Sequence, residues 1–441
     1  MNPYPVYKDS GIEWIGEIPE HWEMRNLKRI ISEPLKYGAN EPAESIDKDL
    51  PRYIRITDFG ENGELRDETF KSLSEEKAKD YLLREGDLLL ARSGATVGKS
   101  FLFRGYRGKA CFAGYLIKAT FNLDRTDPRF IYYFTKSLYY ENWKNSIAIQ
   151  ATIQNIGADK YAYLPFPYVE SLPEQRAIAT YLDRKTQQID SLIQKAEQKI
   201  ALLQEQRAAL INQAVTRGLT HLPPAQGGTQ GLPLKDSGVE WIGEIPEHWE
   251  VKKLKYCFGL KTISLETDLP QVGLEHLESF TGAINYYEVN YEGIGTVFQV
   301  NDILFGKLRP YLAKVWKATF EGQAVGDFFV LSPNSIINPS YGHNILLCSS
   351  VIELCNSSTF GAKMPRVNWE FMSKISLPVP PIGEQNKVSE YIRIQNGHIH
   401  ILLSKEQSRI NLLKEYRQTL ISEVVTGKVC VLDEVPQATA S

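Results

Sequence analysis

Cysteine is scarce and scattered in this chain. Its five cysteines form no CxxC pair, which argues against a zinc site or a disulfide framework and predicts a reducing cytoplasm. Long apolar runs are also missing, since none reaches the ~20 residues that a membrane helix needs. The first residues, MNPYPVYKDSG, have no basic segment followed by an apolar one, so we expect no signal peptide. The cysteines are Cys111, Cys257, Cys348, Cys355 and Cys430.

Charge of one sign does not dominate the chain either. The formal net charge is −3 over 441 residues, so any nucleic-acid signal must be local. Hydrophobic residues make up 43% and charged residues 23%, which is typical of globular proteins and excludes a disordered chain. The length predicts several domains.

The sequence contains no complete catalytic motif. SGATVGKS (93–100) resembles a phosphate-binding loop, but Ser93 replaces the first glycine and the residues that follow predict a strand, whereas such a loop must open a helix. Asn338-Pro339-Ser340-Tyr341 resembles the Asn-Pro-Pro-Tyr motif of amino-methyltransferases. It aligns on Asp127-Pro128 of the first half, however, and is interpreted as a helix cap. His398 and His400 do not share a helix face, so they make a poor metal site. We therefore expect a non-catalytic chain without a metal or a cofactor of its own.

Two segments of the chain each occur twice. Residues 8–23, KDSGIEWIGEIPEHWE, return at 235–250 with a single change, and residues 174–216 align without gaps on 384–426. We call the first pair the lead-ins. The order is lead-in, variable region, helix, and then the same again, which predicts two similar halves related by a pseudo-twofold axis.

The second repeated segment predicts a long helix in each half. Apolar residues recur every seven positions, as in a coiled coil. Each helix spans about 43 residues, or roughly 65 Å, which is too long for a compact domain, so we expect the two to pair antiparallel as a scaffold or spacer. The stripes are Leu182, Ile189, Ala196, Leu203 and Leu210 with Ile193, Ile200, Arg207 and Ala214, and Ile399, Glu406, Leu413 and Leu420 with Leu403, Ile410, Arg417 and Val424.

The variable regions predict two compact α+β domains built on twisted sheets. Short β-rich runs such as DLLLA (87–91) and DILF (302–305) alternate with turn signals. The expected domains are residues 1–170 and 235–380. The expected helices are 171–218 and 381–430, with a linker at 219–234 and a tail at 431–441.

Local positive charge is the feature that the variable regions share. No acidic residue occurs from Leu88 to Leu123 or from Ile303 to Phe320. Aligning 86–100 on 301–315 places a basic loop after a buried strand in both halves. Loops on a rigid sheet often carry recognition residues, and basic side chains there can bind phosphates or read guanine. The candidate DNA-binding residues are Arg92, Ser93, Thr96 and Lys99 in the first loop, and Lys307, Arg309, Tyr311 and Lys314 in the second.

A turn-rich segment before each long helix offers further hydrogen-bonding groups. It reads ATIQNIGADK at 151–160 and FGAKMPRVNW at 360–369. We include Gln154, Asn155, Lys363 and Arg366 as candidates for contacts with bases, although polar turns of this kind are common in proteins without such a role.

With these features the chain resembles a specificity subunit of a type I restriction–modification system. The resemblance covers nearly the whole length and depends on the repeated SGxEWIGEIPEHW lead-in, and on LPEQ (172–175) and IGEQ (382–385) before the long helices. In the second of these, Gly383 replaces Pro173. The resemblance implies that each variable region is a target recognition domain for one half of a split, asymmetric DNA site, and that the paired helices set the gap between the halves.

The resemblance also implies partners. Two methylation subunits and a motor–nuclease restriction subunit would join the chain on double-stranded DNA, and adenine N6 methylation with S-adenosylmethionine would take place in the partner chain. The lead-in tryptophans either pack within the domain and on the other half's helix or contact a partner. Two alternatives stay open: a related system with a fused methylase–nuclease partner, and a coiled-coil adaptor without a DNA role.

Overall fold

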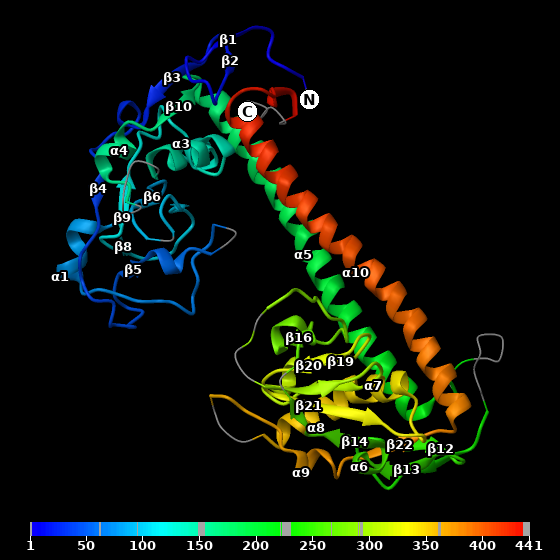
Figure 1. Ribbon diagram of the computed structural model, residues 1–441. Helices are drawn as coiled ribbons and strands as arrows, with labels where there is room; N and C mark the ends of the chain where they lie inside the picture. Colours follow the sequence, from blue (N-terminus) through cyan, green and yellow to red (C-terminus); the bar gives the residue numbers. More distant parts are fainter. Residues whose placement is uncertain are drawn as a thin grey trace. The chain divides into compact units, whose positions relative to one another are not determined.

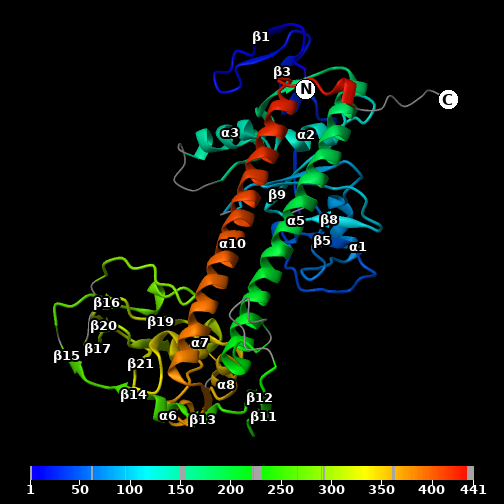
Figure 2. The same cartoon turned by 90° about the vertical axis from the view of Figure 1, so that its right-hand side faces the viewer.

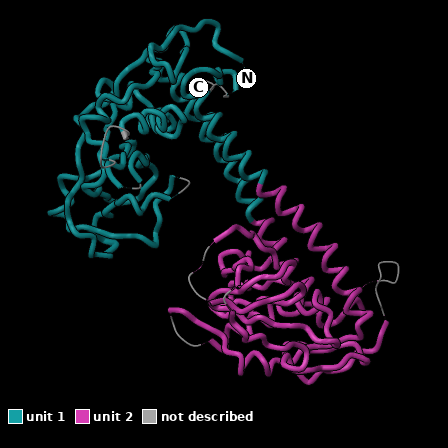
Figure 3. Tube along the Cα trace, viewed as in Figure 1, with its two compact units in different colours: residues 1–197, 408–441 teal, residues 198–407 magenta. Residues whose placement is uncertain are grey.

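The structure is a computed structural model that describes residues 2–60, 63–94, 96–148, 155–220, 222, 231–265, 267–289, 291, 294–359 and 363–434. The chain forms two compact units (Figure 3): unit 1 comprises residues 1–197 and 408–441, and unit 2 comprises residues 198–407. Each unit therefore contains one variable region and a part of both long helices. None of the helices in the described ranges is long and apolar enough to cross a membrane.

Unit 1 is built on a four-stranded antiparallel sheet in the order β4-β9-β6-β7, with three further strand pairs beside it, β1-β2, β3-β10 and the parallel pair β5-β8. The strands are β1 (Tyr7–Asp9), β2 (Glu17–Pro19), β3 (Glu23–Asn26), β4 (Lys36–Tyr37), β5 (Arg52–Ile54), β6 (Leu88–Ala91), β7 (Ser100–Leu102), β8 (Ala110–Phe112), β9 (Leu116–Ala119) and β10 (Pro165–Tyr168). The helices are α1 (Glu75–Ala78), α2 (Pro128–Phe134), α3 (Leu138–Ala148) and α4 (Ala158–Ala162).

Unit 2 repeats this plan, with a four-stranded antiparallel sheet in the order β14-β21-β18-β19. The pairs β11-β12, β13-β22 and parallel β16-β20 match those of unit 1, and β15 and β17 extend the last pair. The strands are β11 (Leu234–Asp236), β12 (Glu244–Pro246), β13 (Glu250–Lys253), β14 (Phe258–Lys261), β15 (Ser264–Leu265), β16 (Gln271–Val272), β17 (Gly295–Phe298), β18 (Ile303–Gly306), β19 (Val315–Lys317), β20 (Gly322–Ala324), β21 (Phe328–Pro333) and β22 (Ser376–Val379). The helices are α6 (Leu254–Cys257), α7 (Pro339–Leu347), α8 (Ser349–Ser357) and α9 (Trp369–Met372).

The two long helices are α5 (Leu172–Arg217) and α10 (Ile382–Val425), which lie side by side (Figures 1 and 2). In unit 1, Leu182 near the start of α5 shares a core with Leu420 near the end of α10. In unit 2, Val215 near the end of α5 shares a core with Val388 near the start of α10. The helices therefore pack antiparallel within each unit, and the prediction of α+β domains combined with a long helix pair is confirmed.

Both long helices end at a glycine in the left-handed conformation. Gly218 has φ +63° and Gly427 has φ +72°, a region that L side chains rarely adopt. Behind Gly427 the amide of Lys428 donates to the carbonyl of Glu423 at 2.8 Å, which closes the last turn. The second helix, expected to reach residue 430, therefore ends at Val425.

The apolar stripes predicted from the heptads are the packed faces of these helices. Ile189, Ala196, Ile399 and Ile410 are all buried. Polar contacts sit within the same stripes: Glu406, also buried, accepts from Lys199 at 2.6 Å in unit 2. In unit 1, Nε of Arg417 lies 2.9 Å from the carboxylate of Asp190.

The prolines that open α2 and α7 are capped as predicted. The carboxylate of Asp127 accepts from the amide of Arg129 at 2.9 Å, and Oδ1 of Asn338 accepts from the amides of Ser340 and Tyr341 at 2.8 and 3.1 Å. The hydroxyl of Tyr341 is buried and donates to backbone carbonyls. The Asn-Pro-Ser-Tyr sequence is therefore a helix start, and its polar groups are already used by the fold.

Candidate nucleic-acid interface

The loop after the central strand β6 or β18 has the same backbone arrangement in both units. The amide of Ala91 donates to the carbonyl of Lys99 at 2.8 Å, and the amide of Gly306 donates to the carbonyl of Lys314 at 2.9 Å. This confirms the predicted alignment of the two loops, in which Arg92 matches Lys307.

Two further segments join each loop in the same way. The amide of Arg92 donates to Tyr115 O at 3.0 Å, and its carbonyl accepts from the amide of Ile156 at 2.8 Å. In unit 2 the amide of Lys307 donates to Asp327 O at 2.7 Å, and its carbonyl accepts from Val367 at 3.1 Å. We call this arrangement the basic junction. It comprises residues 91–94, 96–99, 114–115 and 155–156 in unit 1, and residues 306–314, 326–327 and 365–367 in unit 2.

The basic junction of unit 1 brings together most of its predicted residues. Ser93 pairs with Asn155 as an isolated β-bridge, so the loop and the turn-rich segment do meet. The guanidinium of Arg92 lies 4.8 Å from the ring centre of Tyr37. Lys99 is exposed and Thr96 is half-buried. Gln154 lies outside the described residues.

The basic junction of unit 2 divides its predicted residues into exposed and structural ones. Arg309 and Tyr311 are exposed, and Arg309 adopts a left-handed conformation (φ +50°) at the start of a short helical turn, Pro310–Leu312. Lys314 donates to Leu274 O at 2.7 Å, which is a structural use of its ammonium group. Three predicted residues of unit 2 remain. The ammonium of Lys307 lies 5.4 Å from the Phe329 ring, and Arg366 is paired with Asp327. Lys363 is exposed.

Several basic residues of the sequence windows that lack acidic residues form ion pairs with carboxylates from elsewhere in the chain. Arg104 pairs with Asp183 at 3.1 Å and Lys109 pairs with Glu75 at 2.8 Å. Lys118, which is buried, lies 3.6 Å from Asp87. A sequence window without acidic residues is therefore less positively charged in the fold than in the sequence. Lys99 and Arg309 are among the candidate DNA-binding residues whose charge is exposed.

A groove beside the first basic junction was not predicted. It has a volume of about 630 Å³ and is lined by Thr96 and Lys99 together with Asn40, Thr57 and Arg66. The last three come from segments that are distant in sequence and carry no motif, so only the fold brings them to the loop. All three are exposed, and amide, hydroxyl and guanidinium groups are the ones that proteins use on base edges and phosphates.

The glycine-rich run 93–100 leads directly into strand β7, which begins at Ser100. A phosphate-binding loop needs a helix N-terminus at this point, so the prediction that this run is not one is confirmed.

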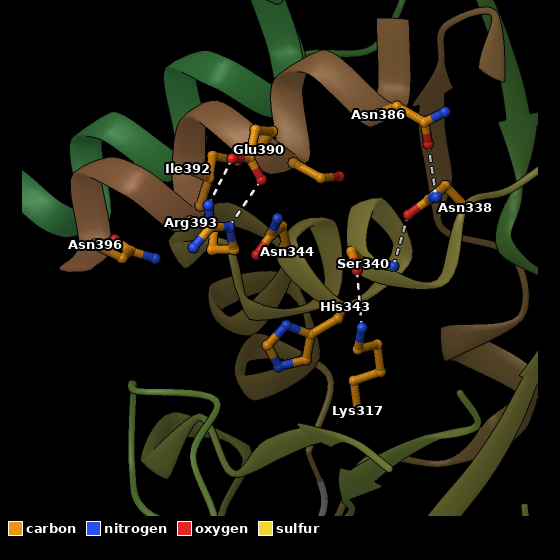
Figure 4. Close-up of a pocket in the computed structure, with 11 residues that line it drawn as sticks. Lys317, Asn338, Ser340, His343, Asn344, Asn386, Glu390, Ile392, Arg393 and Asn396 are labelled. Carbon is orange, nitrogen blue, oxygen red and sulfur yellow. Dashed lines mark hydrogen bonds and ion pairs between the residues drawn. The ribbon is translucent and has the colours of Figure 1, made fainter. Parts of the chain in front are cut away.

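A second cavity lies in unit 2 against the first turns of α10, and Figure 4 shows its polar lining. Lys317 donates to the hydroxyl of Ser340 at 2.9 Å, and Arg393 pairs with Glu390 at 2.6 Å. Burial lowers the pKa of His343 to about 4, so this histidine is neutral at pH 7. Its Nε2 lies 3.3 Å from the carbonyl of Val315. These contacts join residues of the cavity wall, and none of the residues that line the cavity belongs to the basic junction.

Comparison with known proteins shows what the chain is similar to. A family profile, the type I restriction modification DNA specificity domain, matches residues 19–202. The putative type I restriction enzyme MjaX specificity subunit of Methanocaldococcus jannaschii is 25% identical over 96% of this chain and 98% of its own length. Over nearly its whole length the chain is similar to a type I restriction specificity subunit. The EcoDI specificity subunit of Escherichia coli is 23% identical, over 58% of this chain and 60% of that relative's length.

A solved structure supports the fold of this chain. It comes from work on the assembly and conformational transition of the type I R-M system, and it matches with a TM-score of 0.68 at 12% identity. The match covers 93% of this chain and 99% of that one. At this identity the likeness concerns the fold alone.

The repeated motifs of this chain make contacts within the fold. Nε1 of Trp22 donates to Glu174 at 3.0 Å, and Nε1 of Trp249 donates to Glu384 at 2.9 Å. Each lead-in histidine binds the same carboxylate as its neighbouring tryptophan: His21 lies 3.1 Å from Glu174, and His248 lies 2.6 Å from Glu384. The lead-in is thereby fastened to the start of the following long helix.

The glutamine of each repeated Glu-Gln pair is completely buried. Gln175 accepts from the amide of Asp127 at 2.8 Å and donates to Val169 O at 2.7 Å. Gln385 accepts from the amide of Asn338 and donates to Pro380 O, both at 2.7 Å. The glutamine therefore connects the long helix to the cap of α2 or α7.

Proposed function

We propose that this chain is the DNA-reading subunit of a type I restriction–modification complex and recognises a split, asymmetric sequence. Each unit reads one half-site through its basic junction. The observation that supports this most directly is the repetition of one backbone arrangement in both units with different side chains on it. Equivalent backbones favour equivalent docking on DNA, and different side chains favour different half-site sequences.

The chemistry belongs to partner subunits in this proposal. Two methylation subunits bind S-adenosylmethionine and methylate adenine N6, and a motor–nuclease subunit joins for restriction in the cytoplasm. The acceptor adenine has to leave the base stack to reach a partner's active site. The specificity subunit contributes binding energy, about 1–3 kcal/mol for each good base contact, and places the methylation subunits on the adenines of both half-sites.

Mapping N6-methyladenine across the host genome, with and without this gene, tests the proposal. Loss of one split, asymmetric methylated motif on deletion is the expected result, and it supplies both half-sites at once. An unchanged methylation pattern, together with no salt-dependent gel shift by the chain, contradicts the proposal and favours a coiled-coil adaptor. Dependence on a single fused methylase–nuclease gene instead of separate subunits identifies the related type of system.

A further inference from the structure

One position of the basic junction differs in chemical character between the two units. Tyr115 and Asp327 are equivalent: each follows a glycine, and each carbonyl accepts the amide hydrogen of the first basic loop residue, at 3.0 and 2.7 Å. We propose that this position decides which base each unit reads: Tyr115 by direct contact in unit 1, and Asp327 by positioning Arg366 in unit 2. The inference builds on the proposed function and names specificity-determining residues within it.

In unit 2, a carboxylate holds the guanidinium of Arg366 in place. Nε of Arg366 lies 3.0 Å from both oxygens of Asp327, and Nη2 lies 2.9 Å from one of them. Those contacts use one edge of the guanidinium and leave the Nη1–Nη2 edge, with its two parallel N–H groups, for another acceptor pair. The side chain is 48% exposed, so that edge is within reach of DNA.

Guanine is the base that fits such an edge. Its O6 and N7 acceptors lie side by side in the major groove and bind arginine through two parallel hydrogen bonds. A guanidinium that is already fixed loses less conformational freedom on binding. Asp327 is therefore a positioning residue that acts through Arg366, and the base pair read is one with guanine.

In unit 1, the same backbone position carries an exposed ring. Tyr115 is 64% exposed and borders the groove that contains Lys99, Asn40 and Arg66. A tyrosine ring at this place can make an apolar contact with a base edge. The apolar group that base pairs present in the major groove is the thymine methyl group. The two units would then read different bases from one backbone platform.

The test uses the full chain assembled with its methylation subunits and the methylated motif as DNA. Competition binding is measured against duplexes with one base pair of the motif changed at a time. We expect Asp327→Asn and Arg366→Lys to lose about tenfold of the discrimination at the same guanine of one half-site, with the other half-site unchanged. Tyr115→Ala should lose discrimination at a thymine of the opposite half-site, and Tyr115→Phe should retain it.

Matched controls separate reading from folding. Glu370→Gln breaks the exposed Glu370–Lys374 pair of α9 in the same unit, and Tyr163→Ala removes another exposed tyrosine of unit 1. Neither should change discrimination at any base pair. Equal weakening on all duplexes, or unchanged discrimination in the Asp327 and Tyr115 variants, overturns the inference. If the wild-type complex prefers no split motif at all, the proposed function fails as well, so the two failures are distinguishable.

Discussion

At the scale of single residues, the number of basic residues in a sequence window differs from the number whose charge is available in the folded chain. Of the six basic residues between Leu88 and Leu123, three are paired with carboxylates that come from outside this window: Arg104, Lys109 and Lys118. In each pair the carboxylate offsets the charge of the cation, whether the pair is partly exposed, as for Arg104 and Lys109, or buried, as for Lys118. The side chains that keep their charge available are therefore a better guide to a DNA contact than the composition of the window.

Arg92 in unit 1 and Arg309 in unit 2 should act on different half-sites. We expect Arg92→Gln to weaken binding to the unit 1 half-site by about 1–3 kcal/mol and to leave the other unaffected, and Arg309→Gln to do the reverse, because in the proposed function each arginine contacts only the bases of its own half-site. Binding to duplexes in which one half-site is scrambled measures each effect separately.

Lys109→Gln is the control for these arginines, since Lys109 belongs to the same acid-free window but is already paired with Glu75. Loss of binding on both half-sites by either arginine variant would contradict the assignment of one basic junction to each half-site.

His343 should make the stability of unit 2 depend on pH. Burial lowers its pKa to about 4 from 6.5, so the unfolded chain binds more protons than the folded chain between these values. Stability is therefore full above about pH 6.5 and falls as the pH drops toward 4, by about 2–3 kcal/mol for this group. Urea midpoints at pH 7 and pH 5 should differ less in His343→Gln than in the wild type. His400→Gln, on the exposed side of α10, should retain the wild-type difference.

At the scale of elements, the sequence predicted the helices that are marked by a heptad period or by a capping residue. The heptads predicted the long helices and their buried faces, and Asp127-Pro128 and Asn338-Pro339 predicted the starts of α2 and α7. Strand order could not be predicted, because short strands do not specify their partners. For the same reason the Asp327–Arg366 pair was missed: its two residues meet only after β21 and the segment before α9 are placed together.

The glycine that ends α10 should be difficult to replace. Gly427 has φ +72°, and a Cβ there would lie 2.4 Å from Cγ of Pro19 in the lead-in. Gly427→Ala should therefore destabilise unit 1 by about 1–3 kcal/mol, through both the left-handed backbone and the clash. The urea unfolding midpoint measures this.

Gly397 is the matched control for this change. It lies in the interior of α10, is exposed, and would have nothing within 4 Å of an added Cβ. Gly397→Ala should stabilise the chain by about 0.5–1 kcal/mol, since glycine is a poor helix former. Equal effects of the two substitutions would refute the role given to the Gly427 turn.

At the scale of the whole molecule, two copies of one plan serve two purposes. The residues that are alike in both halves, such as Trp22 and Trp249 with Glu174 and Glu384, fasten lead-in to helix. The residues that differ, such as Tyr115 and Asp327, lie on the basic junctions. In the proposed function, duplication of the first set preserves a common framework for two copies of a methylation subunit, and divergence of the second lets the chain read an asymmetric sequence.

A chain with a net charge of −3 should nevertheless bind DNA in a strongly salt-dependent manner, because the proposed contacts with phosphates involve local clusters of basic residues. Each neutralised phosphate adds about 0.9 to the slope of log affinity against log salt. Lys99, exposed beside the unit 1 groove, is expected to contact a phosphate, so Lys99→Gln should lower that slope by about one unit and weaken all duplexes alike. Affinities measured between about 50 and 200 mM salt give the slope, and Lys109→Gln should leave it unchanged. A Lys99→Gln chain that loses affinity with an unaltered slope would show that this lysine contacts a base or supports the loop, and not a phosphate.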